Sequence, residues 1–247
     1  MPCDPQVLLC ARLIQTAYAM ADASHEPDVA TVLAGYGLTL DAVIEGVDPM
    51  SGPTPFGFIA SAADRTTYCA FRGTDSAVEG FEDAEFFQSA CPLAPGANWE
   101  DGFGRVFNSL TVNGQPLTAY LEDEELDPAT WNNTVFTGHS LGAPLALFAA
   151  LCAGAKAVHL FESPRPGNAA LAAAVAASSW FPASTSWAVE DDWVPDWPKG
   201  LWPLVSDYAQ AIPLRYLPRN LVSPPIAADP LSCHRLASVT ALLQALP

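Results

Sequence analysis

Ser140 is the residue whose surroundings most clearly predict chemistry. It lies at the centre of Gly138–Gly142, a stretch with the pattern G-x-S-x-G. Glycines on both sides leave room for a sharp turn, which we expect to expose the serine hydroxyl at its tip above backbone N–H groups. Such a hydroxyl attacks a carbonyl carbon when a base removes its proton, so the pattern predicts nucleophilic catalysis at an acyl group.

This turn requires a strand before it and a helix after it, and the flanking segments predict both. Residues Thr134–Thr137 are β-branched or aromatic and predict a strand. Residues Ala143–Ala153 form an apolar run rich in alanine and leucine, which predicts a buried helix. This combination is typical of the nucleophile elbow in an α/β-hydrolase fold.

A nucleophilic serine needs a base, and the chain has four histidines. In this fold the base follows the serine in sequence, which excludes His25. His139 is part of the turn and is expected to point away from the hydroxyl, whereas His159 lies inside a predicted strand. We therefore expect His234, near the C-terminus, to be the base.

The acid that orients the base also follows the serine. The candidates are Glu162, Glu190, Asp191, Asp192, Asp196, Asp207 and Asp229. Residues 190–192 directly follow a predicted strand at 184–189, and catalytic groups of parallel sheets gather at such carboxyl ends. Spacing alone does not choose among these three acids, and a solvated acidic turn is the alternative for those that take no part.

Hydrolysis at a carbonyl also needs N–H donors for the negative charge that develops on oxygen. Leu141 follows the serine at the start of the predicted helix and is expected to supply one donor. The segment Phe71–Asp75 leaves a strand and turns at Gly73, which makes Thr74 the candidate for the second. An ordinary turn between strand and loop is the alternative for this segment.

Strands and helices alternate after residue 130, which favours an α/β fold with a central, mostly parallel sheet flanked by helices. A chain of 247 residues is expected to form one domain spanning 1–247. The remaining expected elements are helices at 5–23, 102–120 (interrupted near 113–114), 167–177 and 233–246, and strands at 56–62, 66–71 and 158–161. We expect no regular element between the first helix and residue 55, and an irregular region at 73–98.

Composition excludes several classes of partner. Acidic residues outnumber basic ones 27 to 10, and the net charge of −17 argues against binding nucleic acid or an anionic membrane. Residues 140–155 are uncharged but fall short of about 18 apolar residues, and the uncharged stretch 166–189 is broken by Pro182 and several serines. The sequence therefore predicts no integral membrane segment. The N-terminus lacks the basic region of a signal peptide, which favours a cytoplasmic location or an already processed secreted form.

The cysteines and histidines suggest neither a metal nor a cofactor. Cys69 and Cys152 fall within predicted elements as small apolar residues. Cys3 or Cys10 could form a disulfide with Cys91 or Cys233 in an oxidising compartment. No cysteine–histidine spacing predicts a metal site, and no phosphate-binding glycine motif is present.

Four motifs in order make the sequence similar to the class 3 lipases, the family of the fungal triacylglycerol lipases. Phe71–Thr74 resembles the end of the family's oxyanion strand, with Thr74 as donor, and residues 138–143 match its elbow. Residues Ser163–Asn168 resemble its P-R-V-G-N turn. Asp192–Pro195 resembles its D-x-V-P segment, whose aspartate is the catalytic acid. The resemblance thus selects Asp192, and the expected final helix beginning at His234 is similar to the family's last helix.

The resemblance implies a serine carboxylic-ester hydrolase, most simply a lipase that cleaves acylglycerols or related lipid esters through an acyl-enzyme without a cofactor. A short-chain esterase, phospholipase, feruloyl esterase or thioesterase would use the same triad. An inactive binding module on the same fold is an alternative of another class. One departure from the family is W-E-D-G-F at 99–103, where V-H-x-G-F is common.

Two apolar segments have open roles. Residues 76–90 occupy the place of the family's lid and mix phenylalanines with acids. They form either an amphipathic lid that transiently contacts a lipid interface or a helix packed permanently on the body. Trp193, Trp197 and Trp202 either pack the loop beside the proposed acid or line an acyl pocket.

Overall fold

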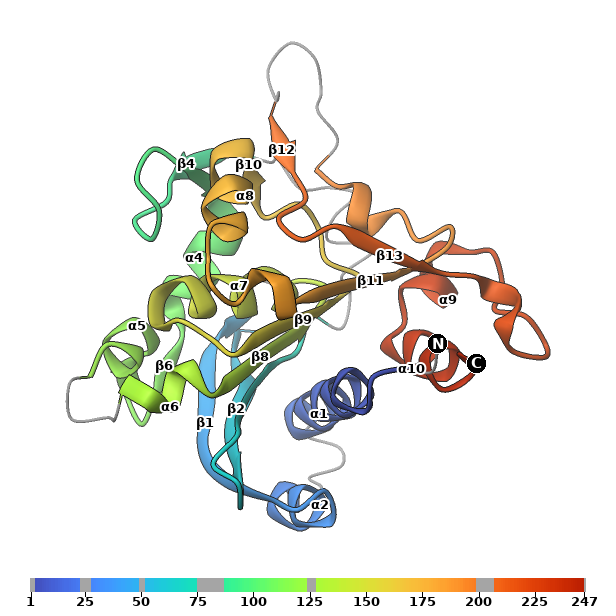
Figure 1. Ribbon diagram of the computed structural model, residues 1–247, viewed down its shortest axis with the longest axis horizontal. Coiled ribbons are helices and arrows are strands. Elements are labelled where there is room, and N and C mark those ends of the chain that lie inside the picture. Colours follow the sequence, from blue (N-terminus) through green and yellow to red (C-terminus); the bar gives the residue numbers. More distant parts are fainter. Residues whose placement is uncertain are drawn as a thin grey trace.

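A computed structural model describes residues 3–22, 28–48, 52–74, 87–123, 128–198 and 207–246. In these residues, a nine-stranded sheet with the order β13-β11-β9-β8-β3-β2-β1-β6-β7 runs through the centre (Figure 1). Its strands are β1 (Leu38–Asp48), β2 (Gly52–Ala62), β3 (Thr67–Phe71), β6 (Thr111–Val112), β7 (Gln115–Pro116), β8 (Thr134–His139), β9 (Ala157–Phe161), β11 (Thr185–Val189) and β13 (Leu214–Leu217).

The half of the sheet from β3 to β13 is parallel, and the half from β3 to β7 is antiparallel. Parallel strands bring their carboxyl ends to one edge. Phe71 at the end of β3 pairs with Gly138 in β8, and His139 pairs with Phe161 at the end of β9. The segments that follow these strands therefore emerge side by side, as expected for the predicted α/β-hydrolase fold.

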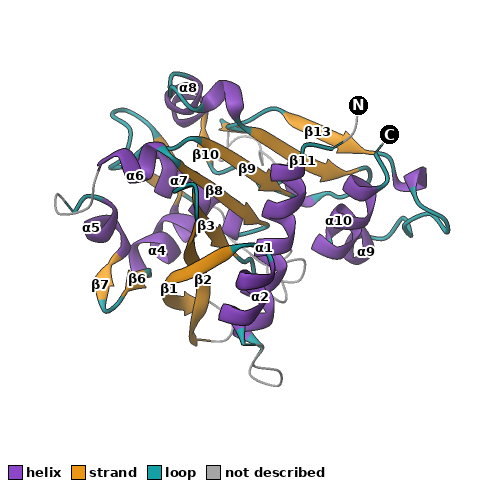
Figure 2. Cartoon of the chain, turned by 60° about the horizontal axis from the view of Figure 1, so that its bottom comes forward, coloured by secondary structure: helices purple, strands orange, loops and turns teal. Residues whose placement is uncertain are grey.

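Helices cover both faces of the sheet (Figure 2). One group of helices contributes residues to a single apolar cluster: α1 (Pro5–Ala21), α2 (Val29–Gly35), α9 (Pro230–His234) and α10 (Leu236–Gln244). The other group packs in a second cluster: α4 (Asp101–Ser109), α5 (Leu117–Leu121), α6 (Pro128–Asn132), α7 (Gly142–Ala153) and α8 (Ala169–Ala176). The two apolar clusters therefore pack against opposite faces of the sheet.

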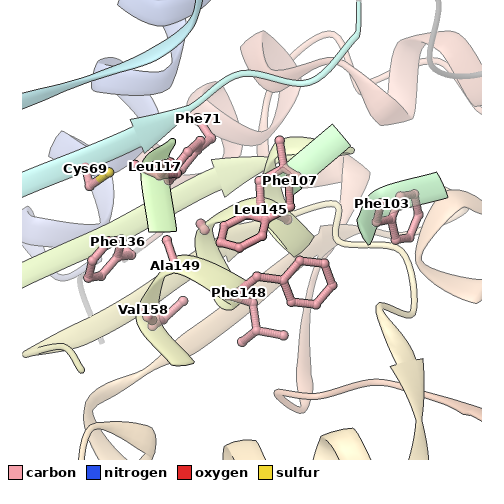
Figure 3. Packing of buried hydrophobic residues seen from close by; sticks show 14 of the residues in the cluster. Cys69, Phe71, Phe103, Phe107, Leu117, Phe136, Leu145, Phe148, Ala149 and Val158 are labelled. Atoms are coloured by element: carbon pink, nitrogen blue, oxygen red, sulfur yellow. The ribbon is translucent and has the colours of Figure 1, made fainter. Parts of the chain in front are cut away.

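Helix α7 is apolar on every side because it is surrounded by protein. Its residues 142–150 are all buried, which is the pattern expected of a core helix. Phe148 in α7 meets Phe107 in α4 with ring centroids 5.7 Å apart, and Leu145 and Phe136 lie in the same layer (Figure 3). This packing holds the first turn of α7 against the carboxyl ends of β3 and β8.

Three sequence-based expectations about the elements were wrong. Residues 38–48, expected to be irregular, form the long strand β1, which pairs with β2 over most of its length. The expected helix at 233–246 begins at Pro230 and is divided in two by the extended backbone of Arg235. The region 73–98 contributes β4 (Gln88–Ala90) to a small second sheet with β5 (Asn98–Glu100), β10 (Gly167–Asn168) and β12 (Tyr208–Ala209).

The cysteines are free thiols in the structure. Cys10 and Cys69 are fully buried, and Cys91 and Cys233 are also buried. Burial raises the pKa of the Cys10 thiol to about 12, with smaller contributions from its neighbours. Among the described helices, none is both long and apolar enough to cross a lipid bilayer.

Candidate active site

The elbow places Ser140 at the junction of β8 and α7. Its φ of +55° lies in the left-handed region, which is strained for a serine. The backbone N–H of Ser140 donates to the carbonyl oxygen of Phe161 over 3.0 Å. A Cβ on Gly138 would lie 2.0 Å from the carbonyl oxygen of Gly142, so this turn requires glycine at 138.

The structure brings Ser140, His234 and Asp192 into one hydrogen-bonded chain. Nε2 of His234 lies 2.8 Å from Oγ of Ser140, and Nδ1 lies 2.7 Å from Oδ2 of Asp192. Because a carboxylate accepts and does not donate, Nδ1 carries the proton and Nε2 accepts from the serine hydroxyl. The other oxygen of Asp192, Oδ1, accepts from the backbone N–H of Val194 over 3.0 Å.

One expectation about Ser140 was wrong: its side chain is buried, not exposed at the tip of the turn. The imidazole of His234 lies against its hydroxyl. Gly73, at the end of the neighbouring strand, lies so close that a Cβ there would be 2.8 Å from Cβ of Ser140. The sharp turn therefore points the hydroxyl into a packed site.

His234 is the last residue of α9, and α9 and α10 hold it from both sides. Asp229 caps α9 by accepting from the backbone N–H of Ser232 over 2.8 Å. The carbonyl oxygen of His234 accepts a hydrogen bond from Nε2 of His139 over 2.9 Å. His139 thus points away from the Ser140 hydroxyl, as expected, and supports the backbone of the predicted base.

A second chain of hydrogen bonds, which runs from Gly73 through Tyr18 to His139, supports the site. Since Nε2 of His139 donates, its Nδ1 accepts from the hydroxyl of Tyr18 over 2.8 Å. The same hydroxyl accepts from the backbone N–H of Gly73 over 2.9 Å. Tyr18 belongs to α1, and no motif in the sequence indicates this contact. It links the ends of β3 and β8 to the backbone of His234.

Buried histidines make stability depend on pH. Burial, with the nearby His234 as a second cause, lowers the pKa of His139 from 6.5 to about 3, and burial lowers that of His159 to about 4. In the unfolded chain both titrate near their ordinary values, so between these limits the unfolded state binds more protons. The free energy of unfolding should therefore fall as pH is lowered from about 6.5 to 4, by about 1.4 kcal/mol per pH unit for each extra proton.

This pH dependence is measurable by urea unfolding at several pH values. The variant His159→Gln keeps a polar side chain beside Thr185, whose Oγ1 lies 2.9 Å from Nδ1 of His159. We expect a shallower slope for this variant across the same pH window. An unchanged slope would show that His159 is not the source of proton uptake.

The predicted oxyanion donors are residues 74 and 141, on either side of the junction between the end of β3 and the elbow. Leu141 follows it and is the N-cap of α7, and its side chain is buried. Thr74 follows Gly73 and is half-buried. Arg72 fixes this strand end: its Nε donates to the carbonyl oxygen of Pro55 over 2.8 Å, and its Nη1 donates to that of Gly73 over 2.6 Å. Gly73, the residue before Thr74, lies against Ser140, and Leu141 follows Ser140 directly.

The acids after β11 differ in their surroundings. Asp192 is buried, whereas Asp191 is exposed and pairs with Arg219 over 2.8 Å. Burial opposes the ionisation of Asp192, but hydrogen bonds with His234 and Glu162 outweigh it and lower its pKa. Asp192 is therefore ionised beside His234, while Glu190 is exposed.

Glu162, also a candidate acid, lies next to Asp192. One carboxylate oxygen from each of these residues and a ring nitrogen of His234 lie within 4.8 Å of one another, a set that could ligate a metal. Nδ1 of His234 and Oδ2 of Asp192 are already joined by a 2.7 Å hydrogen bond, which a cation would have to break. The arrangement fits proton handling better than metal binding.

In the described part of the loop that contains Trp193 and Trp197, the two indole rings pack against each other. Trp193 and Trp197 meet with ring centroids 5.5 Å apart. Trp202 lies outside the described residues, as do His25 and most of the segment proposed as a lid, up to residue 86. Residues 88–90 of that segment form β4, which pairs with β5.

The chain matches the family model described as "Lipase (class 3)" over residues 68–201, slightly more than half of its length. This range contains Thr74, Ser140, Leu141 and Asp192. His234 lies beyond it. A comparison with curated proteins gave no match.

Solved structures share the fold. A mutant form of MDLA from Penicillium cyclopium is 25% identical, with a TM-score of 0.62, and the match covers 90% of this chain and 81% of that one. The triacylglyceride lipase of Rhizomucor miehei is 20% identical, with a TM-score of 0.62 and coverage of 88% and 82%. A triacylglycerol lipase described as having a serine protease triad is 20% identical, with a TM-score of 0.61 and coverage of 86% and 79%.

The family match and the fold agree with the motifs of the sequence and with the arrangement of Ser140, His234 and Asp192. This protein belongs to the class 3 lipase family and is an ester-hydrolysing enzyme.

Proposed function

We propose that this lipase cleaves carboxylic esters of lipids through an acyl-enzyme on Ser140. The observation that carries the proposal is the continuous chain of hydrogen bonds from the Ser140 hydroxyl through His234 to Asp192, with lengths of 2.8 and 2.7 Å. A serine joined in this way to a base and an acid is the arrangement that activates a hydroxyl for acyl transfer.

In the proposed reaction, Nε2 of His234 takes the proton of Ser140 as Oγ attacks the ester carbonyl. The imidazolium then gives this proton to the leaving alcohol, and the acyl group remains on Oγ. Water, deprotonated by the same nitrogen, attacks the acyl-enzyme and releases the carboxylic acid. Asp192 keeps the proton on Nδ1 and stabilises the imidazolium with its negative charge.

The negative charge on the former carbonyl oxygen is stabilised by the backbone N–H groups of Leu141 and Thr74 and by the Thr74 hydroxyl. The start of α7 contributes its dipole at the same point. Gly73 supports this proposal because only a residue without a side chain fits between Tyr18 and the elbow, which allows the end of β3 to approach Ser140. No metal or cofactor is needed for any of these steps.

The role of Thr74 predicts a selective loss of activity. Thr74→Val removes the hydroxyl but keeps the branched shape, and we expect kcat to fall roughly a hundredfold or more. The matched control is Thr74→Ser, which keeps the hydroxyl and should retain most of the activity. Steady-state kinetics with a p-nitrophenyl ester measure both variants. Equal activity of the two would show that the Thr74 hydroxyl does not stabilise the oxyanion.

The family and the site support a proposal for the substrate class. Two structural relatives are named as lipases of triacylglycerides or triacylglycerols, and we propose lipid esters of this kind for this enzyme. Ser140 is buried, and we propose that the site opens before a substrate reaches it. Transient contact with a lipid interface is the proposed trigger.

This part of the proposal is tested by rates across p-nitrophenyl esters of increasing acyl length, with and without an oil–water interface. A preference for long chains and a rise in rate at the interface are the expected results. A preference for the shortest soluble esters, with no response to the interface, would instead identify a short-chain esterase on the same triad.

A further inference from the structure

Glu162 is a buried acid at the carboxyl end of β9 that the proposed reaction does not use. Its side chain is fully buried, and its φ of +49° is in the left-handed region that favours glycine. Its Oε1 accepts from the backbone N–H of Val189 over 2.8 Å. Among the described residues, its Oε2 meets no hydrogen-bond donor.

An ionised carboxylate in this position would be unfavourable for two reasons. Burial removes its hydration, and an unpaired buried charge costs far more than a neutral group. The carboxylate of Asp192, which pairs with His234, lies beside it. Two carboxylates in contact repel each other, so one of them holds a proton.

The proton belongs on Glu162. Burial, followed by the negative charge of Asp192, raises the pKa of Glu162 well above its usual range, whereas that of Asp192 is lowered. A ring nitrogen of His234 lies within 4.8 Å of the Glu162 carboxyl group, but this histidine is paired with Asp192. Cys233 and Tyr216 also interact electrostatically with Glu162. Neither supplies a positive charge that would stabilise the ionised form.

Protonation also explains the unpaired oxygen. Asp192 and Glu162 interact through their side chains, but two ionised carboxylates contain only acceptors. A proton on the Glu162 carboxyl group supplies the donor that this interaction needs. The pair then carries a single negative charge and a strong hydrogen bond to an ionised group.

We propose that Glu162, as a neutral carboxylic acid, donates a hydrogen bond from Oε2 to the carboxylate of Asp192 and orients it toward His234. Glu162 is thus a positioning residue that acts through Asp192, and this inference rests on the proposed triad. Asp192 is held at three points: by Glu162, by the backbone N–H of Val194 and by His234.

Two substitutions separate a hydrogen-bond donor from a space-filling group. Glu162→Gln keeps the length of the side chain and supplies an N–H donor that never ionises. Glu162→Met has a similar length and no donor. Both are unbranched at Cβ, as glutamate is, so the strain at the positive φ is the same in all three proteins.

Kinetics of the full-length variants with a p-nitrophenyl ester give the first readout. We expect Glu162→Met to lower kcat about 10- to 100-fold with little change in KM, because one hydrogen bond to a charged group is lost. Glu162→Gln should restore kcat to within a few-fold of the wild type. Equal activity of Glu162→Met and the wild type would overturn the proposal.

Infrared difference spectra give a second readout that does not depend on activity. At neutral pH the wild-type spectrum should contain the carbonyl stretch of a buried, protonated carboxylic acid, and Glu162→Gln should lack it. Absence of this band from the wild type would overturn the proposal even if the variants lost activity.

These results are distinct from a failure of the proposed function. If Ser140 is not the nucleophile, Ser140→Ala hydrolyses the ester as the wild type does, whatever Glu162 contributes. If only the proposal for Glu162 fails, Ser140→Ala is inactive, whereas Glu162→Met is fully active or the infrared band is missing.

Discussion

Ser140→Ala should lower kcat for ester hydrolysis by about a million-fold, the loss seen when a triad serine is removed. The substitution deletes the only atom that forms the acyl-enzyme, and the hydroxyl whose proton is accepted by His234 across 2.8 Å. The left-handed backbone at Ser140 is equally strained for alanine, so the fold should be retained. Hydrolysis of a p-nitrophenyl ester measures the effect.

Ser163→Ala is the matched control. Ser163 is a buried serine that follows β9, and its hydroxyl donates to the carbonyl oxygen of Pro164 over 2.9 Å. Loss of that bond should change kcat only a few-fold. Comparable losses in both variants would mean that general damage to the site, and not removal of a nucleophile, explains the result.

Asp192→Asn should lower kcat by about ten-thousand-fold while leaving the fold intact. An asparagine amide can donate to Nδ1 of His234, which would then place the imidazole proton on Nε2. In that tautomer Nε2 cannot accept the proton of Ser140. The loss also removes the negative charge that stabilises the imidazolium.

Asp191→Asn is the control for this second prediction. Asp191 precedes Asp192, but its side chain is exposed and pairs with Arg219 at the surface. Such surface pairs contribute little free energy, so kcat should stay within about threefold of the wild type. A large loss in Asp191→Asn, with activity retained in Asp192→Asn, would show that Asp191 and not Asp192 is the catalytic acid.

The parts of the site that depend on local sequence were predictable. The glycines around Ser140, the apolar run after it and the β-branched run before it each predict their element from nearby residues, and β8 and α7 confirm them. His234 was found by elimination among four histidines. The choice of Asp192 from three adjacent acids required the family resemblance, because their burial depends on the packing of distant strands.

Features that depend on contacts distant in sequence were not predictable. Tyr18 in α1 meets His139 across 121 positions of sequence, and nothing in the helix pattern indicates it. Strand β1 is recognisable by its pairing with β2, whereas its own sequence mixes acids and a glycine with apolar residues. The burial of Ser140 accompanies the close approach of Gly73, which follows β3 and is distant in sequence.

Glu162 shows the same limit in a single residue. Its place after the serine in sequence made it one of several candidate acids, and only the fold places its carboxyl group beside Asp192. Its left-handed backbone is a further signal that only the structure reveals.

Mass-spectrometric mapping of the residue modified by a fluorophosphonate is the most direct test of Ser140 as the nucleophile. Such a probe forms a stable bond to an activated serine, as an ester would form an acyl-enzyme. The adduct should lie on Oγ of Ser140, be absent from Ser140→Ala and form far more slowly in His234→Ala. An adduct on another residue, or unchanged labelling of Ser140→Ala, would contradict the proposed mechanism.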